Sequence, residues 1–134
     1  MLAAPSGKGK TKILQEVRTR TDAPLVNINL ELSRHMLELT EIQRAIQLPR
    51  ILRDIIENFG NDLVLLDNIE MIFDIEMKQD PLRLLLGLSR NVTLVAAWNG
   101  TIADSYLTYS VPGHPEYRRY PIHDFIVVKP ERTA

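Results

Sequence analysis

The sequence predicts an α/β fold in which helices cover a mostly parallel sheet, and three observations lead to this expectation. Predicted helices and strands alternate along the chain. The continuous apolar runs at residues 63–66 and 92–97 are typical of strands buried on both faces. Amphipathic stripes lie between the predicted strands and supply helices to cover them. The chain has 134 residues, of which 45% are hydrophobic, so residues 1–134 suit one domain.

The first half of the chain predicts three helical segments around one strand. Residues 10–18 carry an apolar stripe and predict a helix. Residues 25–30 alternate apolar and polar side chains, which predicts a strand near a sheet edge. Residues 31–48 predict a second helix, and Pro49 should interrupt that helix or start another. A further amphipathic helix is expected over residues 51–59.

The second half predicts the buried part of the sheet. The run at 63–66 is a strand, and the Asp-Pro pair that opens 80–90 is typical of a helix start. The run at 92–97 is another strand, closed by Asn-Gly. Residues 101–121 are polar and rich in turn signals, which predicts a long loop. A final short strand is expected over 125–128.

Residues 4–11 read Ala-Pro-Ser-Gly-Lys-Gly-Lys-Thr, which fits the Walker A phosphate-binding pattern with Ala4 in place of the first glycine. Gly7 and Gly9 allow the tight backbone curl that points N–H groups at phosphates. The lysine before the threonine would reach the β- and γ-phosphates, and the threonine hydroxyl would reach Mg²⁺. A flexible linker is the alternative, but the amphipathic helix that follows favours the phosphate loop. The candidate ATP-binding residues are Ser6, Gly7, Lys8, Gly9, Lys10, Thr11 and Lys12.

An acidic residue follows the buried strand at 63–66, as the Walker B pattern requires. Asp67 would hold Mg²⁺ together with Thr11, although a strand end with a turn-forming Asp is the alternative. Asn68 stands where many ATPases carry a catalytic Glu, and Glu70 lies two residues further on. Either Glu70 activates water, or it is a solvated helix-start acid and hydrolysis is slow.

These motifs resemble the additional-strand branch of P-loop ATPases, which includes the AAA+ proteins. The resemblance implies a three-layer P-loop NTPase with sheet order 5-1-4-3-2. It also implies a sensor role for Asn99 at the γ-phosphate, although an Asn-Gly turn is the alternative. Arg118 and Arg119 lie where such proteins carry an arginine finger, or are solvated loop residues. Two departures are a truncated first strand, with Met1, Leu2 and Ala3 before the loop, and no helical lid.

A closer similarity extends over nearly the whole chain. Five blocks resemble the BrxF family of small P-loop proteins from BREX phage-exclusion systems, at residues 26–34, 65–70, 80–85, 97–100 and 112–117. This resemblance implies a bacterial antiviral component that works with other BREX proteins, uses ATP and Mg²⁺, and is compatible with a homo-oligomer. The family resemblance leaves the protein's step in that system open.

Composition narrows the functional classes. The formal net charge is −1 and no basic run stands out, so DNA contact is expected to be indirect or weak. The chain has no cysteine, which fits a reducing cytoplasm, and no apolar run long enough for a membrane span. The sequence carries no Asn-Lys-x-Asp guanine-recognition motif, which argues against a GTPase, and the base of the nucleotide stays open. Three hypotheses follow: an ATPase in a defence assembly, a nucleotide-bound adaptor that hydrolyses little, and a DNA-associated helper ATPase.

Overall fold

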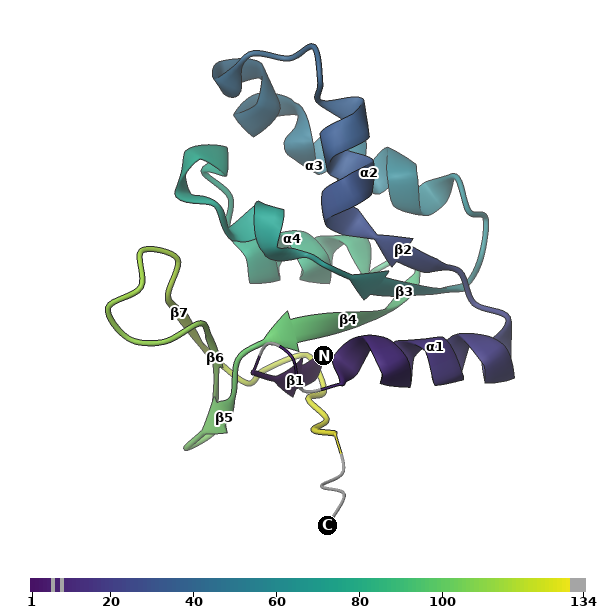
Figure 1. The fold of residues 1–134 in the computed structure, drawn as a ribbon, viewed down its shortest axis with the longest axis vertical. Coiled ribbons are helices and arrows are strands. Elements are labelled where there is room, and N and C mark those ends of the chain that lie inside the picture. The colour runs from purple at the N-terminus through teal and green to yellow at the C-terminus, as the bar shows by residue number, and fades with distance from the viewer. Residues whose placement is uncertain (6, 8, 131–134) are drawn as a thin grey trace.

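A computed structural model describes residues 1–5, 7 and 9–130. At its centre lies a four-stranded parallel sheet in the order β1-β4-β3-β2 (Figure 1). The α/β class and the mostly parallel sheet predicted from the sequence are therefore confirmed. The strands are β1 (Leu2–Ala4), β2 (Leu25–Asn27), β3 (Leu63–Asp67) and β4 (Thr93–Asn99).

The outer neighbour of β1 is a single residue. Val128 forms an isolated parallel bridge to Leu2. The backbone N–H of Ala3 donates to the Val128 carbonyl, and the Val128 N–H donates to the Met1 carbonyl, each at 2.9 Å. The strand predicted at 125–128 is therefore wrong in extent, because one residue holds the place expected for a fifth strand. The three residues of β1 are buried beside β4.

Helices cover both faces of the sheet (Figure 1). Helix α1 (Lys10–Thr21) lies on one face, where its Leu14 packs with Leu65 and Ala97 in one apolar cluster. On the other face, α2 (Ile28–His35), α3 (Glu41–Glu57) and α4 (Pro81–Leu88) pack on a larger cluster. Side chains alternate along β3 between the two clusters, as the pleat of a strand dictates. This two-sided burial explains the continuous apolar run.

Strand β2 is shorter than predicted. It ends at Asn27, whose side chain accepts a hydrogen bond from the N–H of Leu30 at 3.1 Å and caps α2. Ile28 and Leu32 are both buried, at the four-residue spacing of a helix. The strand predicted over 25–30 is therefore wrong for its second half, because the cap starts a helix there.

Pro49 lies inside α3, where it neither interrupts nor starts a helix. The single helix predicted over 31–48 is two helices, α2 and the first part of α3. Thr40 and Gln43 form a reciprocal capping box that starts α3 anew. A proline has no N–H, so Ala45, four residues earlier, loses its helical donor. The side-chain amide of Gln79 donates to that Ala45 carbonyl at 2.8 Å. This contact compensates for the missing bond, and α3 continues to Glu57.

The segment predicted as a loop contains a second sheet. Strands β5 (Ile102–Ala103), β6 (Tyr106–Tyr109) and β7 (Arg118–Pro121) pair antiparallel in sequence order. An aromatic cluster fixes this sheet to the core, because the Tyr109 ring stacks on Phe73 at a centroid distance of 3.5 Å. Trp98 meets both rings edge-on and donates from its indole nitrogen to the Thr108 carbonyl at 2.8 Å. Within the described residues, no helix is long and apolar enough to cross a bilayer.

Candidate functional site

The strands of the central sheet end in polar or loop-forming residues along one edge. In the strand registers, Ala4 lies beside Asn99, and Asn27 lies beside Asp67. All four strands run parallel, so their carboxyl ends meet at this edge, where open α/β sheets bind ligands. The sequence motifs around Gly7, Asp67 and Asn99 therefore come together in space although they are far apart in the chain.

The loop after β1 takes a backbone shape that favours glycine. Gly7 has φ 79° and Gly9 has φ 81°, both in the left-handed region. A Cβ atom at either position would meet nothing within 4 Å, so the conformation and not the space favours glycine. Gly9 caps the first turn of α1, whose free N–H groups point toward the edge. Ser6 and Lys8 of the predicted phosphate loop lie outside the described residues.

Lys10 folds back into this loop. Its side chain is only 7% exposed, and its ammonium donates to the carbonyls of Ala4 and Pro5, each at 2.8 Å. Burial lowers the pKa of this ammonium, while the carboxylates of Asp67 and Glu70 act in the opposite direction. The fold therefore keeps a cation inside the loop, beside two carboxylates. The neighbouring Lys12, also a predicted binding residue, is exposed in the first turn of α1.

Thr11 and Asp67 face each other across the edge. The Thr11 hydroxyl donates to Asp67 Oδ2 at 2.6 Å, and Asp67 is 8% exposed. The backbone N–H of Asn68 donates to the other carboxylate oxygen at 3.0 Å. A hydroxyl and a carboxylate both offer oxygen ligands that suit Mg²⁺. This ion is usually coordinated by one or two protein groups together with phosphates and waters. The described residues contain no group of three or more His, Asp or Glu arranged as a complete metal shell.

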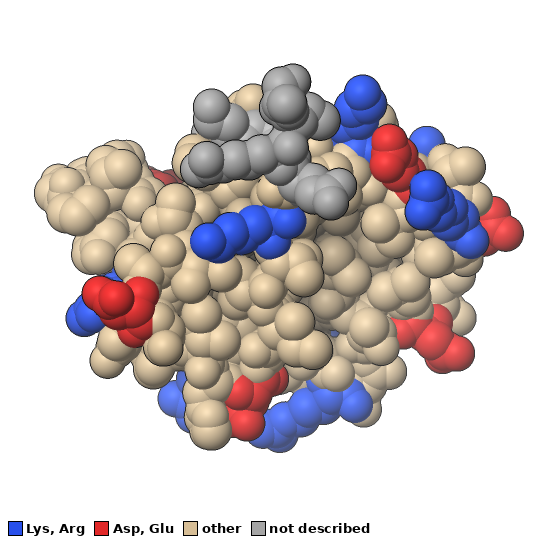
Figure 2. All heavy atoms as spheres, turned by 90° about the horizontal axis from the view of Figure 1, so that it is seen from below, with Lys and Arg blue, Asp and Glu red and all other residues tan. Residues whose placement is uncertain are grey.

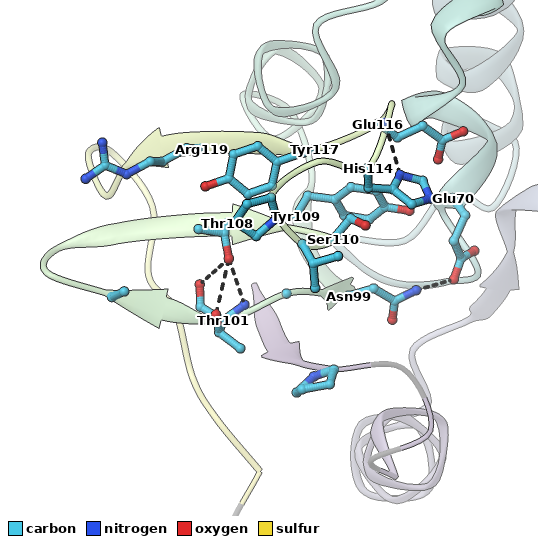
Figure 3. Close-up of a pocket in the computed structure, with 15 residues that line it drawn as sticks. Glu70, Asn99, Thr101, Thr108, Tyr109, Ser110, His114, Glu116, Tyr117 and Arg119 are labelled. Carbon is cyan, nitrogen blue, oxygen red and sulfur yellow. Dashed lines mark hydrogen bonds between the residues drawn. The ribbon is translucent and has the colours of Figure 1, made fainter.

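Glu70 is held from two sides. It opens the 3₁₀ turn η1 (Glu70–Phe73), which the turn η2 (Ile75–Met77) follows. Asn99 Nδ2 donates to Glu70 Oε1 at 2.8 Å (Figure 3), and Asn29 Nδ2 donates to Oε2 at 2.9 Å. Asn29 is fixed in turn, because its Oδ1 accepts the N–H of Met71 at 2.8 Å. The two asparagines thus set the position of one carboxylate beside Asp67.

Asn29 belongs to this cluster, although no sequence motif predicts a role for it. It lies in the stretch predicted as a strand over 25–30, where its side chain would belong to the polar face of that strand. The cap at Asn27 places it instead in the first turn of α2, above the carboxyl edge. The signal available in the sequence was an Asn two residues after a possible helix cap.

The remaining predicted catalytic residues lie further from this cluster or present their backbone to it. Asn68 is exposed with φ 51°, and its carbonyl accepts the N–H of Asn29 at 2.8 Å. Arg119 on β7 stacks over Tyr106, with its guanidinium carbon 3.7 Å from the ring centroid, and points away from Glu70 and Asn99 (Figure 3). Arg118 donates to the Tyr117 carbonyl at 3.3 Å.

The chain gives no match to a protein-family model, to a curated protein or to a solved structure. The residues of the carboxyl edge therefore provide the basis for assigning a function. A buried ammonium, a hydroxyl paired with a carboxylate, and a second carboxylate held by two amides all come from different elements. This arrangement can bind an anionic ligand together with a divalent cation and can accept a proton beside them.

Proposed function

We propose that the chain is a P-loop NTPase that binds ATP with Mg²⁺ at the carboxyl edge of its sheet and hydrolyses it slowly. The observation that carries this proposal is the Thr11–Asp67 hydrogen bond beside the buried Lys10 ammonium. Buried charges are costly unless they are paired or serve a ligand. Among the described residues, Lys10 and Asp67 are the charged side chains that the fold buries, and both come from the Walker motifs.

The binding chemistry follows from the contacts of the loop. Phosphate oxygens would replace the Ala4 and Pro5 carbonyls as partners of Lys10, which would exchange neutral acceptors for charged and stronger ones. The N-terminus of α1 adds N–H donors and a favourable dipole. Thr11 and Asp67 would hold Mg²⁺, which neutralises charge on the β- and γ-phosphates.

Hydrolysis needs a base beside the γ-phosphate, and Glu70 suits that role. An ionised carboxylate offers about four lone-pair sites, and Asn29 and Asn99 occupy two of them. The remaining sites are available to a water molecule. This fixed carboxylate favours an ATPase over a non-hydrolysing adaptor. Turnover is expected to be slow because Arg118 and Arg119 are engaged within the small sheet rather than with Glu70.

The resemblance to the BrxF family supplies the biological part of the proposal. Three of the five similar blocks contain the residues of the carboxyl edge, namely Asn29, Asp67 with Glu70, and Asn99. The similarity thus includes the site, and it also takes in most of α2 and the start of α4. We place the protein on this basis in a cytoplasmic BREX defence assembly, with other BREX proteins as partners.

A DNA-associated helper ATPase receives less support. Such a protein needs a basic face for the phosphate backbone, and its binding would weaken steeply with salt. Figure 2 shows Lys and Arg scattered among Asp and Glu over the described part of the face seen from below Figure 1. The formal net charge of the chain is −1. Direct DNA binding is therefore not part of the proposal.

Calorimetry with ATP or GTP in the presence of Mg²⁺ tests nucleotide binding. Lys10→Ala should weaken binding about 100-fold, because the ammonium is lost from the loop. Lys129→Ala removes an exposed lysine from the C-terminal segment and should leave the affinity as it is. A folded wild-type protein that shows no heat with either nucleotide at millimolar concentration would end the proposal.

Phosphate release separates the ATPase from the adaptor. Glu70→Gln keeps the shape of the side chain but removes its basicity, so kcat should fall by about 10²- to 10⁴-fold. Glu76→Gln changes an exposed glutamate outside the site and serves as the matched control. Binding of ATP by the wild-type protein without any turnover would identify the adaptor instead.

A further inference from the structure

The candidate site opens into a cavity larger than hydrolysis requires. The cavity has a volume of about 690 Å³, and Pro5, Glu70 and Asn99 are among the residues that line it. Figure 3 shows Glu70 and Asn99 at its wall. A water molecule takes about 30 Å³ in the liquid, and pockets for small molecules commonly measure about 300–1,000 Å³. A site that only hydrolyses ATP needs room for one water molecule beside Glu70, which is far less than this volume. The volume matches a second small molecule.

The far wall of the cavity is built by the small sheet and held rigidly. Tyr109 and Thr108 of β6 line it, and the same two residues carry the aromatic stack and the Trp98 hydrogen bond. Gly100 lets the wall approach closely, because a Cβ atom there would lie 1.6 Å from the Thr108 carbonyl oxygen. The space is therefore a fixed part of the fold and is present before any ligand binds.

The lining changes character from one end to the other. Tyr117 offers an aromatic ring on the side of the small sheet, away from Glu70 and Asn99 (Figure 3), and Val111 and Pro112 add apolar surface to the lining. His114 also lines the cavity, and its Nδ1 accepts the N–H of Glu116 at 3.0 Å, so the neutral ring carries its proton on Nε2 as a donor. At the sheet edge, Glu70 and Asn99 present a carboxylate and an amide. The lining fits a ligand with a planar body at one end and a hydroxyl at the other.

We propose that this cavity binds a second substrate, a small alcohol with a planar body of about the size of a nucleoside, and that its hydroxyl receives the γ-phosphate of ATP. The inference rests on the proposed function, since it needs ATP at the carboxyl edge. The hydroxyl oxygen forms a bond to the γ-phosphorus while the bond from that phosphorus to the bridging oxygen of ADP breaks. The bonding electrons leave with ADP, and the hydroxyl proton passes to the Glu70 carboxylate.

The test uses ATP labelled in its γ-phosphate, Mg²⁺, and uridine, cytidine or guanosine as the probe. Glycerol is the control probe, because it carries hydroxyls without a planar body. We expect labelled phosphoester with at least one nucleoside, and inorganic phosphate as the labelled product with glycerol. Calorimetry of ATP binding on the same protein is the accompanying measurement.

Two tyrosine variants show whether transfer uses this cavity. Tyr117→Ala removes an aromatic wall and should lower the ratio of phosphoester to inorganic phosphate about tenfold. Tyr106→Phe changes a tyrosine of the same small sheet that does not line the cavity, retains the ring on which Arg119 stacks, and should keep the ratio. Equal ratios in the two variants would overturn the role of the cavity.

The possible outcomes distinguish failure of this inference from failure of the proposed ATPase function. ATP binding and phosphate release without phosphoester from any of the three nucleosides would overturn the inference and leave the ATPase standing. Failure to bind ATP would overturn both. Phosphoester in the wild type that falls in Tyr117→Ala and persists in Tyr106→Phe would support the inference.

Discussion

At the carboxyl edge, hydrogen-bond partners fix the positions of individual side chains. Glu70 would be a mobile surface carboxylate without its contacts, but Asn29 and Asn99 each bind one of its oxygens. The two amides come from α2 and from the end of β4, which are not neighbours in the sequence. The position of the proposed base therefore depends on two elements at once, and catalysis is sensitive to displacements of about 1 Å.

Replacing Asn29 by alanine should slow hydrolysis without removing a group that touches phosphate. We expect kcat to fall about 10- to 100-fold because Glu70 loses one fixed donor, while KM for ATP changes much less. Steady-state kinetics measure this split. Asn91→Ala, at an exposed site after α4, is the control and should match the wild type. A rise in KM with kcat unchanged would contradict a positioning role.

At the level of elements, a side chain distant in sequence replaces a hydrogen bond that a helix lacks. Helix α3 contains a proline, and the amide of Gln79 binds the Ala45 carbonyl that the proline leaves without a helical donor. The same amide nitrogen donates to the Met77 carbonyl at 2.7 Å. Gln79, which follows η2, thus links its own segment to α3. We infer that this contact helps α3 to remain continuous through Pro49.

A double-mutant cycle tests this repair. Gln79→Met removes the donor at similar size and should lower the free energy of unfolding by about 1–3 kcal/mol, because a partly buried carbonyl loses its partner. In a Pro49→Ala background the backbone N–H of residue 49 can bind Ala45, so the same change should cost less. Urea denaturation gives both values. An equal cost in the two backgrounds would show that Gln79 acts elsewhere.

Two glycines in different elements should respond oppositely to alanine. Gly100→Ala places a methyl group against the Thr108 backbone, so it should destabilise the protein by about 1–3 kcal/mol through displacement of β6. Gly87 lies inside α4, where an added Cβ atom would meet nothing within 4 Å, so Gly87→Ala should stabilise the protein by about 0.5–1 kcal/mol. Thermal denaturation of both variants, compared with the wild type, checks the signs.

The sequence predicted the parts of the fold that depend on local pattern. The buried strands around Leu65 and Ala96 follow from continuous apolar runs, and the cap at Asp80 follows from Asp-Pro. The parts that failed depend on contacts distant in sequence. Nothing local indicates that Gln79 would sustain a helix through Pro49, or that Tyr109 would stack on Phe73 and order a segment rich in turns. Tertiary contacts override propensity in both cases.

Part of the candidate site could likewise be predicted from local sequence pattern, and part could not. The Walker-type residues Lys10, Thr11 and Asp67 could be found from spacing, because their chemistry requires a fixed order of residue types. Asn29 and the cavity could not be found, since both arise where separate elements meet.

Over the whole molecule, the small sheet is tied to the helical layer as well as to the central sheet. The Tyr120 hydroxyl on β7 donates to Asp80 Oδ1 at 3.3 Å, and the same oxygen accepts the N–H of Arg83 to cap α4. Burial and the nearby Asp80 carboxylate raise the pKa of Tyr120 to about 12, above its usual value of 10.0. Ionisation of this phenol therefore opposes the folded state.

Stability should consequently fall on the alkaline side. The unfolded chain loses the Tyr120 proton near pH 10 while the folded chain keeps it to about pH 12, so the stabilisation is complete below pH 10 and lost across that interval. Urea denaturation at a series of pH values should show a falling free energy of unfolding. The fall should be shallower in Tyr120→Phe, and identical slopes for the two proteins would refute the assignment.

The aromatic cluster also gives the protein an internal optical reporter. Trp98 is the single tryptophan of the chain, is fully buried, and immediately precedes Asn99. Its indole bonds to the β6 backbone that walls the cavity, so its emission is sensitive to movements of the small sheet relative to the sheet edge. A ligand that moves the small sheet, at the proposed nucleotide site or in the cavity, can thus be followed in unlabelled wild-type protein as a change in fluorescence.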